Sequence, residues 1–183
     1  MQLAEYFEDV VVLRAGETDS SMLQRRLHEQ GRRSWSLDLS NAAAWRDTLA
    51  QVLARARAHR APGVLLLLPG AQDDRRFWRS QDHLVEHLDG RDWDIVYLGH
   101  GPGGSPGEQD NLRAGLVHCD VPPGRVSAVA VRCGVLDQLV HAMPGTGADG
   151  PLAPDDWLVI ACWLAQGLTA PGNGWAAWPP LMH

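Results

Sequence analysis

A buried strand followed by a glycine-rich loop is the part of this sequence best suited to hold a ligand. The run from Trp93 to Leu98 is largely apolar, and Gly99, His100 and the loop 101–104 follow it. In open α/β sheets ligands bind beyond the carboxyl ends of the strands, where glycine lets the backbone approach closely. His100 could contact a ligand or phosphate there, or be a bystander. The loop lacks the Gly-Lys-Ser/Thr ending of a P-loop and the glycine spacing of the dinucleotide fingerprint.

A pair of carboxylates, Asp155 and Asp156, follows Pro154 at the expected start of a helix. A positioned carboxylate can act as a general base that removes the proton of a hydroxyl group. The same two residues suit an ordinary helix cap, because negative charge is favourable at a helix N-terminus. The sequence leaves both roles open.

Several catalytic classes lack their characteristic residues. There is no Gly-x-Ser-x-Gly elbow, and the eight histidines show neither HExxH nor HxH spacing, which disfavours a hydrolase triad and a zinc hydrolase. The three cysteines form no CxxC pair, so a cysteine-based zinc site is not expected. Three unpaired cysteines suit a reducing compartment, and we therefore expect a cytoplasmic protein.

The first hundred residues alternate between strand and helix patterns. Strands are expected at 10–14, 34–39, 64–68 and 94–98, and helices at 21–30, from about 41 to 60, and at 77–88. Met22, Leu23 and Leu27 should form the buried face of the first helix. This order predicts a parallel, doubly wound sheet with right-handed crossovers.

The composition changes after Gly99. The sequence predicts a loop at 101–109, strands at 116–121 and 126–131, a helix at 136–143, a further helix from Pro154 and an extended tail from Gly174. A chain of 183 residues, 45% of them hydrophobic, suits one domain with its own core. The formal net charge of −6 argues against a nucleic-acid-binding protein. No apolar run approaches the length of a transmembrane helix, and the acidic N-terminus does not resemble a signal peptide.

The motif Trp93-Asp94-x-x-x-Leu98-Gly99 and the order of the surrounding segments resemble glycosyltransferase family 25, the lipooligosaccharide-biosynthesis and collagen-galactosyltransferase group. The resemblance covers nearly the whole chain in reduced form. It implies an α/β, nucleotide-diphospho-sugar-transferase-like (GT-A-like) fold, with a mostly parallel sheet and helices on both faces. It also implies a single domain over 1–183, with a nucleotide-binding half at 1–100 and an acceptor-side half at 101–183.

The family's activity would be transfer of a hexosyl group from a nucleotide sugar to a hydroxyl acceptor. The resemblance places the metal ligands for Mn²⁺ or Mg²⁺ at Asp73 and Asp74, whose oxygen atoms suit either ion. It makes Asp155 or Asp156 the candidate catalytic base. The substrate-binding residues would be Leu13, Arg14, Asp94, Gly99 and His100.

The chain departs from the family's motifs at three places, one of which is the absence of the Asn and Arg of the first motif. Pro69 and Gly70 stand where the family's acidic cluster directly ends the aliphatic strand, and Asp73 and Asp74 come later, where they can equally cap a helix. The family's Cys-x-x-Ser-His segment is replaced by the run 41–45, Asn-Ala-Ala-Ala-Trp. The alternative function is therefore a catalytically degenerate protein that binds or scaffolds a partner in a biosynthetic pathway.

The eight tryptophans are numerous for this length, and several lie near the C-terminus: Trp157, Trp163, Trp175 and Trp178. Aromatic rings can stack on sugars, and they also serve as core and interface anchors. We expect the second role, with a homodimer or a protein partner bound through this region.

Overall fold

The structure is a computed structural model that describes residues 6–7, 9–14, 21–38, 42–68, 71, 81–100, 115–119, 126–142 and 174–178. The elements of the first half are β1 (Asp9–Arg14), α2 (Ser21–Glu29), β2 (Arg33–Asp38), α3 (Ala42–Ala58), β3 (Gly63–Leu67), α5 (Gln81–Leu88) and β4 (Ile95–His100). Those of the second half are β5 (Gly115–His118), β6 (Val126–Arg132), α6 (Cys133–Ala142) and β7 (Gly174–Trp178). The chain is therefore an α/β protein, with strands and helices close to the expected positions.

The described strands form a seven-stranded sheet in the order β2-β1-β3-β6-β4-β7-β5. β1 pairs in parallel with β2 and β3, and β4 pairs in parallel with β7. β6 lies between β3 and β4 and is antiparallel to both, and β5 is antiparallel to β7. The sheet is mixed, with three parallel and three antiparallel pairings, so the parallel sheet expected from the sequence is found only in part. β3 and β4 are not neighbours, because β6, from the second half of the chain, lies between them.

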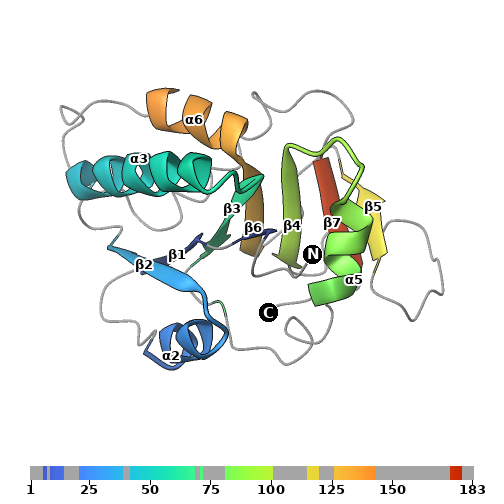
Figure 1. Cartoon of the computed structure of the whole chain (residues 1–183), viewed down its shortest axis with the longest axis horizontal. Coiled ribbons are helices and arrows are strands. Elements are labelled where there is room, and N and C mark those ends of the chain that lie inside the picture. Colours follow the sequence, from blue (N-terminus) through green and yellow to red (C-terminus); the bar gives the residue numbers. More distant parts are fainter. Residues whose placement is uncertain are drawn as a thin grey trace.

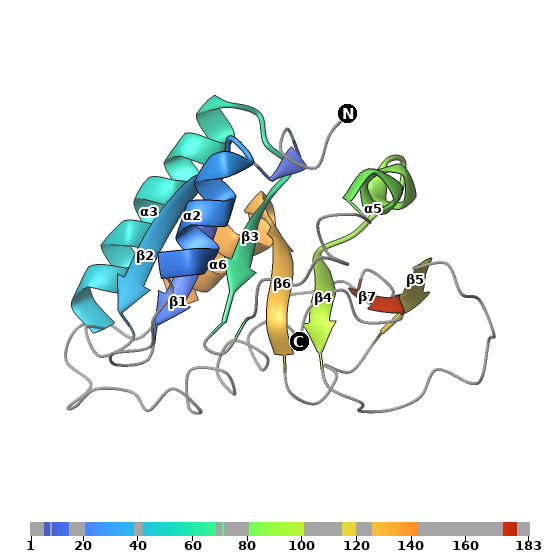
Figure 2. The same cartoon turned by 90° about the horizontal axis from the view of Figure 1, so that it is seen from below.

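Helices cover both faces of this sheet, with α3 and α6 on one face and α2 and α5 on the other (Figures 1 and 2). Along β1, Val11 and Leu13 pack toward α3 and α6, whereas Val10 and Val12 pack toward α2 and α5. Every residue of β3 is buried. Burial on both faces explains why these strands read as continuous apolar runs without alternation.

Two helices end at glycines in the left-handed backbone region, Gly31 with φ 69° and Gly90 with φ 77°. Residues with a Cβ atom rarely adopt this conformation, so glycine is the usual residue just beyond a helix. The expected face of α2 needs one correction. Met22 is 73% exposed, whereas Leu23 and Leu27 are buried. Leu23 and Leu27 lie one helical turn apart and share a face, and Met22 points away from it.

β4 continues further than the sequence suggests. Gly99 and His100 belong to the strand and pair with β6, so the strand does not stop at Gly99 as expected. The pairing with β6 shifts register between Tyr97 and Gly99, and again between Gly99 and His100. Glycine in a strand often marks such an irregularity. Gly99 therefore marks a register irregularity inside the strand rather than its end, and the loop 101–104 lies outside the described residues.

Candidate functional site

The carboxyl ends of the parallel strands meet at one edge of the sheet. In Figure 2 the arrowheads of β1, β2, β3 and β4 all point toward the same side of the molecule. After β1 the chain forms β2 on one side of it and then β3 on the other side. The topological switch point, where open α/β sheets bind ligands, therefore lies between the carboxyl ends of β1 and β3.

Arg14 is the charged residue at this switch point. It ends β1 and lies in register with Asp38, the last residue of β2. Its Nε atom is buried and has no hydrogen-bond partner among the described residues. A buried N–H group without an acceptor costs free energy, and an anion would supply an acceptor of matching charge. The position and chemistry of Arg14 thus suit a phosphate or carboxylate ligand.

The other expected substrate-binding residues are distributed differently. Leu13 is only 3% exposed and packs in the core beneath α3 and α6, so only its backbone is placed to meet a ligand. Gly99 and His100 end β4 at the same edge as Arg14, but β3 and β6 lie between β4 and β1. Val126, the first residue of β6, pairs with His100. It reaches this edge although the sequence did not mark it as a site residue.

Asp94 is not brought together with these residues. It precedes the first residue of β4, and therefore lies at the opposite edge of the sheet from His100. Its backbone carbonyl accepts a hydrogen bond of 2.9 Å from the N–H of Arg132, and its carboxylate lies 4.0 Å from Nη1 of that residue. Asp94 thus holds the end of β6 in place. The Trp-Asp and Leu-Gly pairs of one motif lie at opposite ends of one strand.

The four aspartates expected to bind metal or act as a base, Asp73, Asp74, Asp155 and Asp156, lie outside the described residues. Within the described part of the chain, no group of three or more His, Cys, Asp or Glu side chains is placed to hold a metal ion. In the same part, no helix is both long and apolar enough to span a bilayer.

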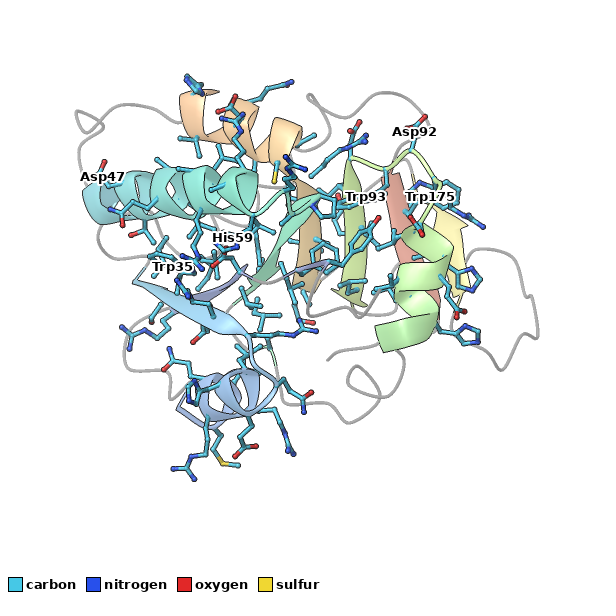
Figure 3. The ribbon with its side chains drawn as sticks, viewed as in Figure 1. Trp35, Asp47, His59, Asp92, Trp93 and Trp175 are labelled. Carbon is cyan, nitrogen blue, oxygen red and sulfur yellow. The ribbon has the colours of Figure 1, made fainter. Side chains whose placement is uncertain are left out.

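A buried polar cluster lies at the amino edge of the sheet, at the other end of β1. Asp9 is 1% exposed, and its Oδ1 accepts a hydrogen bond of 2.9 Å from Nε1 of Trp35. Nε of Arg55, in α3, lies 3.3 Å from the same oxygen. Figure 3 shows Trp35 between the first strands and α3. The cluster ties β1 to β2 and α3, and so fixes the strand that carries Arg14.

Trp93 packs in the core and Trp175 lies at its margin, so neither ring is fully exposed for stacking on a sugar. Trp93 is 2% exposed and packs against Tyr6 and Phe7, with ring centroids 6.4 and 6.0 Å away. Trp175, labelled near β7 in Figure 3, is half-buried, and its Nε1 donates a hydrogen bond of 3.2 Å to the backbone carbonyl of Asp92. The Arg91 guanidinium lies 4.9 Å from the ring centroid of Trp175. The other C-terminal tryptophan side chains lie outside the described part.

Comparisons with protein-family models, with curated proteins and with solved structures found no match for this chain.

Proposed function

We propose that this chain is a glycosyltransferase-like protein that binds a nucleotide sugar at the carboxyl ends of β1 and β3 and transfers its hexosyl group to a hydroxyl acceptor. The observation that carries the proposal is Arg14, with a buried Nε atom that lacks a partner among the described residues, at the switch point between the parallel strands β1 and β3. The diphosphate is the anionic part of a nucleotide sugar, and a guanidinium group recognises phosphate oxygens in a fixed geometry.

In this proposal the diphosphate oxygens accept hydrogen bonds from Arg14. The ends of β4, at Gly99 and His100, border the same edge and would contact the remainder of the ligand. Asp73 and Asp74 would hold Mn²⁺ or Mg²⁺, because hard divalent ions prefer carboxylate oxygens. When bound, the metal would supply positive charge beside the diphosphate.

The acceptor hydroxyl must lose a proton as the new glycosidic bond forms and the bond from the sugar to the diphosphate breaks. Asp155 or Asp156 would accept that proton. The nucleoside diphosphate leaves with the electrons of the broken bond, and its negative charge is stabilised by Arg14.

The second candidate function is non-catalytic: the carboxyl edge of the sheet would bind a ligand, but no hexosyl group would be transferred. It is favoured by Pro69 and Gly70, which follow β3 at the place where the family resemblance requires carboxylates. Such a protein would bind a nucleotide or a pathway partner without catalysing the reaction.

Calorimetric titration with UDP, in the presence and absence of Mn²⁺, tests the binding step. Arg14→Gln should weaken UDP binding about 10- to 100-fold, since a hydrogen bond to a charged group contributes about 1.5–3 kcal/mol. Arg25→Gln removes the same charge from the exposed surface of α2 and should leave the affinity unchanged. If the wild-type chain gives no heat and no thermal shift with UDP, the proposed function is refuted.

Hydrolysis or transfer from UDP-hexoses then separates the two candidates. An active transferase should release UDP in a Mn²⁺-dependent reaction that Asp73→Asn or Asp155→Asn slows. UDP binding without turnover of any UDP-hexose would support the non-catalytic candidate instead.

A further inference from the structure

Two histidines lie one turn apart on the surface of α5. His83 and His87 occupy positions i and i+4, which share one face of a helix. Their rings are stacked, with centroids 5.6 Å apart and an angle of 23° between the ring planes. The side chain of His83 is 51% exposed, so the pair is open to ions from solution.

A carboxylate orients the first of these rings. Nδ1 of His83 lies 3.2 Å from Oε2 of Glu86. An ionised carboxylate only accepts hydrogen bonds, so the tautomer that donates from Nδ1 to Glu86 is the one whose Nε2 has a lone pair for a metal ion. Metal-binding histidines are commonly oriented in this way by a carboxylate on the second ring nitrogen.

We propose that His83 and His87 chelate a divalent transition-metal ion of the Zn²⁺, Ni²⁺ and Cu²⁺ class, with Glu86 orienting His83. Imidazole nitrogen suits these ions, whereas Mg²⁺ and Ca²⁺ prefer oxygen ligands. Zinc–nitrogen distances of about 2.0–2.1 Å require the two nitrogens to lie within about 4 Å of each other. Chelation therefore requires both rings to turn from the stacked arrangement, so that one nitrogen of each faces the ion.

The position along the helix also favours a cation. His87 lies in the last turn of α5, where the partial negative charge of the helix C-terminus attracts positive charge. The spacing His-x-x-Glu-His is that of the inverted zinc hydrolases. However, the side chain of Glu86 is 74% exposed, and the described residues offer no third ligand. The two histidines would therefore bind the metal ion without catalysing a reaction, and water would fill its remaining coordination positions.

The site is separate from the one in the proposed function, which requires oxygen ligands and a nucleotide. Zn²⁺ or Ni²⁺ alone, without UDP, is therefore the appropriate probe. Failure of UDP to bind would not affect this proposal, and failure of Zn²⁺ to bind would not affect the other.

Calorimetric titration of the full, tag-free chain with ZnCl₂ and NiCl₂ tests the site. We expect His83→Ala and His87→Ala each to weaken binding on the order of 100-fold, because a single imidazole loses the effective concentration of its neighbour. Glu86→Gln should weaken it about tenfold, at the lower end of the effect of an orienting partner. MgCl₂ should give no saturable signal at these histidines.

His141→Ala is the matched control. His141 is also exposed and lies 3.5 Å from a carboxylate oxygen of Asp137, but on α6 it has no second histidine one turn away. Its removal should leave zinc and nickel affinity unchanged. Equal affinity in wild type, His83→Ala and His87→Ala would overturn the proposal, as would the absence of Zn²⁺ and Ni²⁺ binding by the wild type. His83, Glu86 and His141 are exposed and His87 is half-buried, and circular dichroism checks that the variants fold.

Discussion

Gly63, at the start of β3, lies where the strand approaches β6 and Trp93 too closely for a side chain. A Cβ atom built on Gly63 would lie 2.6 Å from the carbonyl oxygen of Val131 and 2.7 Å from Cη2 of Trp93. Unstrained contacts of this kind are about 3.5 Å or longer, so the neighbours would have to move by nearly 1 Å. One of them is backbone within a paired strand, and the other is a tryptophan that is 2% exposed.

Gly63→Ala should therefore lower the free energy of unfolding by about 2 kcal/mol. Overpacking a core costs about 1–3 kcal/mol, and the backbone contact places this site in the upper part of that range. The reduced freedom of the unfolded chain offsets about 0.4–1 kcal/mol. For a chain of this size the melting temperature should fall by about 4–8 °C. Urea denaturation and thermal scans followed by circular dichroism measure both quantities.

Gly134→Ala is the matched control, because a Cβ atom on Gly134 would meet no atom within 4 Å. Gly134 lies in α6, where alanine is the better helix former, so this variant should be slightly more stable than wild type, by up to about 0.5 kcal/mol. Combining Gly63→Ala with Trp93→Phe removes the Cη2 contact and should cost less than the sum of the single changes. If Gly63→Ala proves as stable as the wild-type chain, the close approach of β3 to β6 and Trp93 is refuted.

Three further predictions concern other parts of the fold. Asp9→Ala should destabilise the chain by about 2–3 kcal/mol because it removes the buried acceptor of Trp35 and the ion-pair partner of Arg55; a loss below about 1 kcal/mol in urea denaturation would contradict this. Gly31→Ala should cost about 1–2 kcal/mol because φ of 69° is unfavourable for alanine although no atom crowds the site, and a melting temperature equal to wild type would count against it. Burial raises the pKa of the Cys133 thiol, so at pH 8 this thiol should react with iodoacetamide more slowly than in the urea-unfolded chain. Because that pKa is raised by folding, the contribution of Cys133 to stability should be present below the pKa of the unfolded thiol and decline as the pH rises through the folded value. Equal reaction rates in the folded and unfolded chain would exclude the raised pKa.

Local patterns predicted the individual elements well because the signals that form them are local. β1 and β3 are marked by their own apolar runs. The ends of α2 and α5 are marked by glycines that follow them directly in the sequence. The place of β6 could not be obtained in this way. Its composition of valine and alanine predicts a buried strand, but it does not state which strands it separates or in which direction it runs. That information comes from contacts with distant segments: the residues of β3 that pair with β6 lie more than sixty residues before their partners in the sequence, and those of β4 more than twenty-five.

The difference between local sequence patterns and long-range contacts also explains why only some of the expected site residues lie together. The Trp-Asp-x-x-x-Leu-Gly motif is contiguous in sequence, and this suggested that its residues act together. A strand extends by about 3.3 Å per residue, however, so residues at its two ends lie far apart. Asp94 consequently packs with Arg132 at one edge, while Gly99 and His100 reach the other.

Arg14 gains its importance from the strand order and not from its neighbours in sequence. It follows four apolar residues, a context that is equally compatible with an ordinary solvated strand end. Only when β2 and β3 are seen on opposite sides of β1 does its position become the switch point of the sheet. The cluster of Asp9, Trp35 and Arg55 holds the amino end of β1 in place, and Arg14 lies at the carboxyl end of the same strand. If that anchoring matters for the site, Trp35→Phe should weaken UDP binding as well as stability, although the lost hydrogen bond is to Asp9, at the opposite end of β1 from the proposed diphosphate position. Unchanged UDP affinity in a destabilised Trp35→Phe variant would show that the anchor supports the fold alone.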